Sequence, residues 1–248
     1  FYNGNPCTLT VSNNIFNNWT SGDGYLTGIN ISGLTGTATC SNNIVSNITC
    51  NGDLEGINLS PVGSSGQFTL LNNSISELNS GGGYIYGISG NIPLVPNTVQ
   101  ININNNSIHG LTSSYATGEI AGIYLFSGHA STTVSITGNK IFDLSETASG
   151  SYVYGIFTEP TLAATVTYSN NYIGDLRAPL SNASNSSIRG LSLSMAAGVS
   201  NVYYNTIHLA ATGSAATFST AAVYADASVA LTLRNNIFSN TSTGGLSG

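Results

Sequence analysis

The chain has 248 residues, of which only 6% are charged, and its four Lys and Arg residues leave a formal net charge of −6. So few cations cannot neutralise many phosphates, which excludes a nucleic-acid-binding surface and an anionic membrane partner. No apolar run of about 18 residues occurs, so no membrane span is expected. The Asn-, Ser-, Thr- and Gly-rich, lysine-poor composition favours an extracellular protein with a neutral polar surface.

One phrase recurs in chain order: an alternating apolar segment, an Asn and a second apolar segment. Residues 134–144 (VSITGNKIFDL) and 166–176 (VTYSNNYIGDL) show it most clearly. Apolar residues stand three residues before the Asn and two after it, and mostly five before it as well. This period of two indicates β-strands on both sides. The central Asn recurs every 29 to 34 residues, at Asn14, Asn43, Asn73, Asn106, Asn139, Asn171, Asn205 and Asn236.

A second strand-like block lies between successive Asn phrases. It usually contains a Gly followed by Ile or Leu, as in 84–89 (YIYGIS) and 152–157 (YVYGIF), and it degenerates to 220–225 (TAAVYA). Gly- and Ser-rich turns separate these strands. Each repeat is therefore expected to contain at least two strands. Three strands agree better than two with the length of the repeat.

The predicted fold is an all-β, right-handed parallel β-helix of about eight coils with about 31 residues each, forming a single domain over residues 1–248. A leucine-rich-repeat solenoid is the alternative, because it also uses an Asn after an alternating strand. That repeat is only about 20 to 29 residues long and often returns through a helix. The Gly- and Ser-rich return segments disfavour a helix by about 0.5 to 1 kcal/mol per residue.

The repeated Asn is expected to be structural. Asn tolerates the left-handed backbone of a tight bend better than most residues do, so we place the Asn at the bend between two strands. Coils stacked about 4.8 Å apart would let the amides bond one another and the buried backbone. Three cysteines, Cys7, Cys40 and Cys50, allow one disulfide or none, and no C-x-x-C metal spacing occurs.

Residues 202–240 and the YGI blocks resemble the right-handed β-helix repeat regions of long bacterial surface and secreted proteins, many of them exported by the type IX route. The resemblance covers essentially the whole chain and implies a β-helix in an extracellular location. The same fold occurs in pectate lyases, polygalacturonases and phage tailspikes. In enzymes of this fold, the strand that corresponds to the GI block usually forms the saccharide-facing sheet.

Outward positions of the GI blocks carry aromatic residues that could stack on sugar rings. Strand propensity explains the same residues without a ligand. The candidate glycan-binding residues are Tyr86, Tyr124, Tyr154, Phe157 and Tyr224. A separate outward column, from Thr10 to Thr232, is rich in Thr and would suit either an ordinary strand surface or an ice-binding ladder.

Asp143 and Asp175 stand four residues after successive repeated Asn residues, so they should lie on adjacent coils. A carboxylate pair at that spacing suits a retaining glycosidase or part of a calcium site. The alternative is two exposed turn residues compensated by Arg177. His109 and His208 fall three coils apart and are expected to be exposed turn residues. Lyase chemistry of this fold would need a basic residue beside a cluster of three acids, and none of Lys140, Arg177, Arg189 and Arg234 has such a cluster. We therefore predict no catalytic residues and no cofactor, with a polysaccharide lyase or glycoside hydrolase as the alternative.

The predicted function is that of an extracellular structural or adhesive β-solenoid, with glycan binding or polysaccharide degradation as the alternative. Phe1 and Gly248 fall at one phase of the repeat, and no charged or helical cap is evident at either end. Open solenoid ends expose unpaired strand edges, which soluble repeat proteins normally cover. The expected partners are therefore further coils of the same chain, as in a longer repeat array, or copies of the chain stacked end to end into a fibre.

Overall fold

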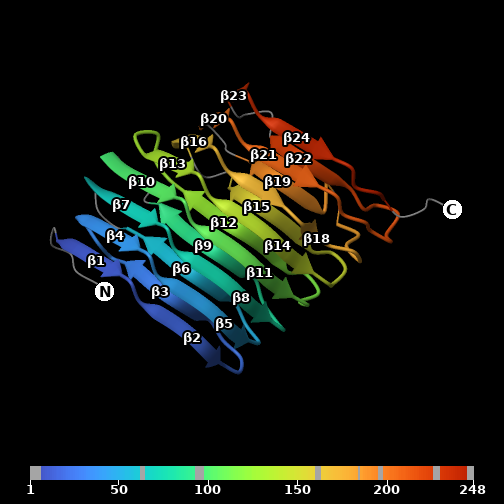
Figure 1. Ribbon diagram of the computed structural model, residues 1–248, viewed down its shortest axis with the longest axis horizontal. Helices are drawn as coiled ribbons and strands as arrows, with labels where there is room; N and C mark the ends of the chain where they lie inside the picture. Colours follow the sequence, from blue (N-terminus) through green and yellow to red (C-terminus); the bar gives the residue numbers. More distant parts are fainter. Residues whose placement is uncertain are drawn as a thin grey trace.

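The computed structural model describes residues 7–61, 65–92, 98–159, 163–183, 185–194, 198–225 and 230–244; the ends at Phe1 and Gly248 lie outside them. These residues form a right-handed parallel β-helix of about seven turns of about 32 residues, seen from the side in Figure 1. No helix occurs in the described ranges, so the β-helix is confirmed and the leucine-rich-repeat alternative is wrong. The same ranges accordingly contain no helix that could cross a membrane.

Three parallel sheets run along the solenoid, because each turn contributes strands to all three. The eight-stranded sheet contains β1 (Thr8–Ser12), β4 (Thr37–Ser41), β7 (Ser65–Leu71), β10 (Thr98–Asn104), β13 (Thr133–Thr137), β16 (Thr165–Ser169), β20 (Val199–Tyr203) and β23 (Ala230–Arg234). The nine-stranded sheet contains β2 (Ile15–Thr20), β5 (Ile44–Cys50), β8 (Ser74–Ser80), β11 (Ser107–Ser113), β14 (Lys140–Glu146), β17 (Tyr172–Gly174), β18 (Leu176–Arg177), β21 (Thr206–Leu209) and β24 (Ile237–Asn240). The seven-stranded sheet, formed by the GI blocks, contains β3 (Leu26–Ser32), β6 (Leu54–Ser60), β9 (Ile85–Ile92), β12 (Glu119–Ser127), β15 (Tyr152–Thr158), β19 (Ile188–Leu193) and β22 (Thr220–Ala225).

The core is a set of apolar columns that run along the solenoid axis. The column two residues after the repeated Asn is fully buried from Val45 to Ile207. It packs against the Gly column of the seven-stranded sheet: a Cβ built on Gly155 would lie 2.5 Å from the Ile173 side chain. Each buried Ile or Leu contributes about 1.5 to 3 kcal/mol by leaving water. Gly is therefore needed at this position, because the neighbouring side chain and backbone leave no space for a Cβ atom.

The repeated asparagines form the predicted ladder, and Asn106 shows its geometry. The Asn106 carbonyl oxygen, Oδ1, accepts hydrogen bonds from the backbone N–H and the side-chain Nδ2 of Asn73, at 2.9 and 3.0 Å. The Asn106 Nδ2 donates to the Leu70 carbonyl and to Asn139 Oδ1, both at 3.0 Å. The same amide-to-amide bond links every neighbouring pair from Asn14 to Asn236. The ladder therefore satisfies backbone groups that the bend would otherwise bury unpaired.

The left-handed bend lies one residue earlier than the sequence suggested. The residues with positive φ directly precede the ladder Asn, as at Asn72 (φ 54°) and Asn105 (φ 56°), so the prediction that the ladder Asn itself adopts this backbone is wrong. A second left-handed column stands four residues after the ladder and includes Asn47, Asp143 and Asp175. Asn and Gly recur at both columns, and Asp at the second, because these residues tolerate this backbone at low cost.

Replacing Tyr204 by Asn is expected to stabilise the protein by about 1 kcal/mol. Tyr204 has a φ of 58° and is 58% exposed, whereas the other described coils place Asn or Gly at this bend. Chemical denaturation with an unchanged m-value would measure the gain. Tyr203→Asn is the matched control, because Tyr203 lies in strand β20 outside the left-handed region. An equal gain from the control would show that backbone conformation is not the cause.

The three cysteines are free thiols rather than disulfide partners. Cys40 and Cys50 are completely buried, and burial raises the pKa of the Cys40 thiol to about 12. The Cys40 sulfur accepts a hydrogen bond from the Nδ2 of Asn43, at 3.3 Å. Cys40 thus serves as a small core residue beside the ladder.

Candidate functional site

The outward surface of the seven-stranded sheet differs from the rest of the solenoid. The eight-stranded sheet presents mainly hydroxyl and amide side chains, with Thr10 in register with Thr39 and Thr39 with Thr69. The seven-stranded sheet instead gathers aromatic rings, carboxylates and one arginine over β9, β12, β15, β19 and β22. We call this cluster the aromatic–carboxylate face; it comprises Tyr84, Tyr86, Glu119, Tyr124, Phe126, Tyr152, Tyr154, Phe157, Glu159, Arg189 and Tyr224.

The inward–outward alternation of side chains is interrupted at the Gly column, which explains how one short strand presents two rings on the same side. In β15, Val153 and Ile156 are both buried inward, whereas Tyr154 and Phe157 both face outward. Gly155 between them takes part in no register pair with β12, where Gly122 is skipped in the same way. The two outward rings consequently approach to 4.6 Å between centroids.

The rings form a continuous packed series across three coils. Tyr86 stacks on Tyr124 with centroids 4.4 Å apart and ring planes 25° apart. Tyr124 continues to Phe157 at 5.4 Å, and Phe157 to Tyr154. Stacked pairs of this kind contribute about 0.5 to 1.5 kcal/mol beyond their buried area.

Two glutamates are held by the stacked tyrosines. The Tyr86 hydroxyl donates to Glu119 Oε1 at 3.1 Å, and the Tyr124 hydroxyl donates to Glu159 Oε1. Burial raises the pKa of Glu119 to about 7, with a further rise from the Glu159 charge, while the Tyr86 hydrogen bond and Arg189 oppose the rise. Glu119 therefore changes charge near neutral pH, which ordinary surface glutamates do not.

Arg189 occupies the opposite part of the face. Its guanidinium carbon lies 3.8 Å from the ring centroid of Tyr224 and 5.4 Å from that of Tyr154. Its nitrogens donate to the Asn185 carbonyl and, at 3.1 Å, to the Ser192 hydroxyl. Arg189 is only 7% exposed, so this cation is fixed among the rings rather than extended into water.

All five aromatic residues proposed from the sequence lie on this face. Tyr86, Tyr124, Phe157 and Tyr154 form the packed series, and Tyr224 joins through Arg189. Sequence reasoning missed Glu119 and Glu159. Glu119 had a detectable signal, because it stands at the first position of its GI block, where the blocks at 84–89 and 152–157 both have Tyr.

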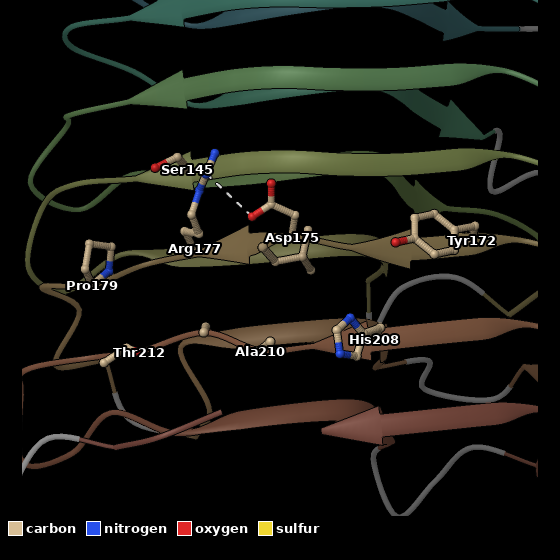
Figure 2. A pocket seen from close by; sticks show the side chains of 10 residues that line it. Ser145, Tyr172, Asp175, Arg177, Pro179, His208, Ala210 and Thr212 are labelled. Carbon is tan, nitrogen blue, oxygen red and sulfur yellow. Dashed lines mark ion pairs between the residues drawn. The ribbon is translucent and has the colours of Figure 1, made fainter. Parts of the chain in front are cut away.

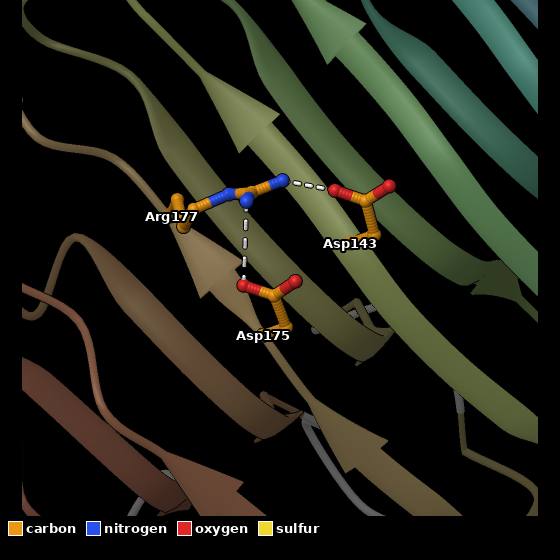
Figure 3. A network of polar contacts seen from close by, with 3 residues as sticks. All are labelled: Asp143, Asp175 and Arg177. Atoms are coloured by element: carbon orange, nitrogen blue, oxygen red, sulfur yellow. Dashed lines mark hydrogen bonds and ion pairs between the residues drawn. The ribbon is translucent and has the colours of Figure 1, made fainter.

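Asp143 and Asp175 lie on the nine-stranded sheet, as part of a surface ion-pair network (Figure 3). Arg177 pairs with Asp143 and, at 3.5 Å, with Asp175, and all three side chains are 43 to 52% exposed. Both aspartates have a left-handed backbone, which gives a structural reason for Asp at these positions. Among the described residues, no group of three or more His, Cys, Asp or Glu side chains is placed to hold a metal ion.

A shallow hollow of about 490 Å³ adjoins this network and is shown in Figure 2. Its lining includes Tyr172, Asp175, Arg177 and His208. The Asp175 carboxylate is already paired with Arg177, so the hollow offers little free charge to a ligand. The prediction that His109 and His208 are turn residues is wrong, because they lie in strands β11 and β21. His208 is exposed, whereas His109 is half-buried and stacks on Phe142 at 4.8 Å.

The fold and the site together define a parallel β-solenoid with one chemically distinct, aromatic–carboxylate face. The chain matches no protein-family model, and no curated protein or solved structure matches it either.

Proposed function

We propose that this protein is an extracellular, non-catalytic β-solenoid that adheres to carbohydrate through the aromatic–carboxylate face. The observation that supports this role is the pairing of stacked rings with glutamates, at Tyr86 with Glu119 and at Tyr124 with Glu159. Carbohydrates offer apolar ring surfaces beside many hydroxyl groups, so rings next to fixed hydrogen-bond acceptors suit them.

Rigidity of the scaffold supports the same role. The face is built on strands joined in register to neighbours on both sides, from β9 to β19. Its polar groups are therefore positioned before a ligand arrives, which reduces the entropy cost of binding. Successive coils would present the same kind of contact along an extended polymer chain.

Tyr124→Ala is expected to weaken binding of a carbohydrate ligand about tenfold or more, because it removes both the stacking partner of Tyr86 and the donor to Glu159. Affinity electrophoresis in a panel of neutral and amine-bearing polysaccharides would find the ligand, and calorimetry would measure the change. Tyr172→Ala is the matched control, since Tyr172 is 42% exposed on another sheet. No retention by any polysaccharide, or equal loss in both variants, would contradict the proposal.

The same incubations test the non-catalytic part of the proposal. We expect no shortened products from any retained polymer. Product formation that Glu119→Gln abolishes would show that the face is catalytic, with Glu119 as an acid or base.

A second role, stacking of coils end to end, is favoured by the direction of the Asn ladder. Within the described chain, Asn14 Oδ1 accepts no hydrogen bond and the Asn236 backbone N–H donates none, so the two ends are complementary. Ile15 and Ile237, on the edge strands β2 and β24, are 64% and 65% exposed. We propose that another coil, from a second copy or from the same polypeptide, extends the ladder there.

Sedimentation of residues 1–248 over a range of concentrations tests the second-copy form of this proposal. Association should increase with concentration and should be lost in Asn236→Asp, whose carboxylate would face the acceptor oxygen of Asn14. Asn240→Asp, on the exposed part of β24, is the control. A monomer at every concentration would exclude stacking of copies.

A further inference from the structure

The charges of the aromatic–carboxylate face and its border are mostly negative. Glu119 and Glu159 lie within it, and Asp53 and Glu55 lie on the adjoining strand or its approach. Arg189 is the only basic residue among these groups in the described part of the chain. No described Lys or Arg forms an ion pair with Glu119 or Glu159. The surface thus repels anionic polymers and lacks a cation at the Tyr86–Tyr124 end.

Within the described part of the chain, the two glutamates have acceptor oxygens that no hydrogen bond uses. Each accepts its tyrosine hydrogen bond through Oε1, and no described residue donates to Oε2 of either side chain. A carboxylate that is partly withdrawn from water gains more from a bound cation than an exposed one does. The pKa of Glu119 is raised because burial makes a negative charge costly there, and the Tyr86 hydrogen bond and the Arg189 charge offset that cost only in part.

Arg189 shows within the same face how a cation is accommodated. Its guanidinium contacts the Tyr224 ring while backbone and hydroxyl acceptors take its N–H groups. Rings together with acceptors are the chemistry that binds ammonium groups. At the other end, Tyr86, Tyr124, Glu119 and Glu159 provide the same combination with carboxylates in place of neutral acceptors.

We propose that the aromatic–carboxylate face binds amine-bearing saccharides, with a protonated sugar amine held by Glu119 and Glu159 beside Tyr86 and Tyr124. This inference rests on the proposed carbohydrate-binding function and adds its ligand class. The sugar ring supplies the apolar surface and hydroxyl groups, and the amine supplies a cation at the Tyr86–Tyr124 end of the face, where no described Lys or Arg lies. N-acetylated sugars lose that charge, and uronic polymers carry the opposite one.

The test compares glucosamine oligomers with N-acetylglucosamine oligomers of equal length by calorimetry. The amine form is expected to bind about tenfold or more tightly, and Glu119→Gln and Glu159→Gln should each remove most of that preference. Asp143→Asn is the matched control, because it removes one carboxylate from a different sheet and should leave the preference intact. Polygalacturonate should not bind.

Glu119→Gln is not expected to impair folding, so a loss of binding in this variant can be assigned to the missing carboxylate. Because the pKa of the Glu119 carboxyl is raised in the folded state, its contribution to the free energy of unfolding falls as pH rises from the unfolded-state pKa through about 7. The neutral amide avoids that loss. Thermal melts of each variant would verify that the fold is intact.

The pH dependence of binding is best measured with an N-trimethylated glucosamine oligomer. Its charge is permanent, so any change of affinity with pH comes from the protein. Its affinity should rise as pH increases through about 7, because Glu119 ionises there beside Glu159, Arg189, Tyr86 and Tyr124. The rise should be absent in Glu119→Gln.

The outcomes separate the two proposals. Equal binding of amine and N-acetylated oligomers, weakened by Tyr124→Ala, would overturn the amine inference and retain carbohydrate binding. An amine preference that survives both glutamate substitutions would also overturn it, because the net charge of the chain alone would then explain the preference. Failure of every saccharide to bind would overturn both proposals.

Discussion

Replacing Asn106 by Ala should lower the free energy of unfolding by about 2 to 5 kcal/mol. Asn106 is 1% exposed, and its amide joins three coils through Asn73, Leu70 and Asn139. Removal leaves the Asn73 amide and the Leu70 carbonyl buried without these partners. Each unsatisfied buried group costs about 1 to 3 kcal/mol, and the solenoid cannot admit water without separating its coils.

Asn14→Ala is the matched control for this substitution. Asn14 belongs to the same ladder and donates to Ser12 and Asn43, but it lies at the first row and is exposed. Water can replace its bonds, so the loss should be about 1 kcal/mol or less. Denaturant unfolding of both variants measures the difference. Equal losses would show that the ladder acts through something other than buried hydrogen bonds.

Replacing Gly122 by Ala should cost about 1 to 3 kcal/mol by overpacking the core. The added Cβ would lie 2.5 Å from the Ile141 Cγ2 and 2.7 Å from the Gly155 carbonyl oxygen. The backbone of the next coil cannot move away easily, because β15 is paired in register with β12 on one side and with β19 on the other. Ala222 occupies the corresponding place in β22, where no further described strand follows in the sheet.

Gly22→Ala separates this steric effect from a general effect of replacing Gly. A Cβ on Gly22 meets no atom within 4 Å, and its backbone lies outside the left-handed region. Its stability should change by no more than about 0.5 kcal/mol. Thermal or urea unfolding of the two variants checks the contrast, and similar losses from both would argue against close packing of the Gly column.

The repeat alone was sufficient for predicting the fold, because a solenoid makes most of its long-range contacts between equivalent positions. Val134 pairs with Val166 and Ile141 with Ile173, as the aligned phrases predict. The left-handed residue was misplaced by one position, from Asn106 to Asn105. Both residues are Asn in most coils, so residue type alone rarely distinguishes the bend from the ladder. The Gly138–Asn139 pair carried the missed signal, because Gly stands at the left-handed position there.

The sequence by itself determined the coil period, the inward columns, the Asn ladder and the strand that carries the aromatic rings. These features follow from periodicity, which a local pattern records directly. Only the tertiary structure decided which side chains meet across coils. The Tyr86 ring stacks on Tyr124, although the register partner of Tyr86 is Ala121. The Tyr124 hydroxyl donates a hydrogen bond to Glu159 on the next coil. Such diagonal contacts depend on side-chain packing between coils, where burial and neighbouring charges also set the pKa of Glu119.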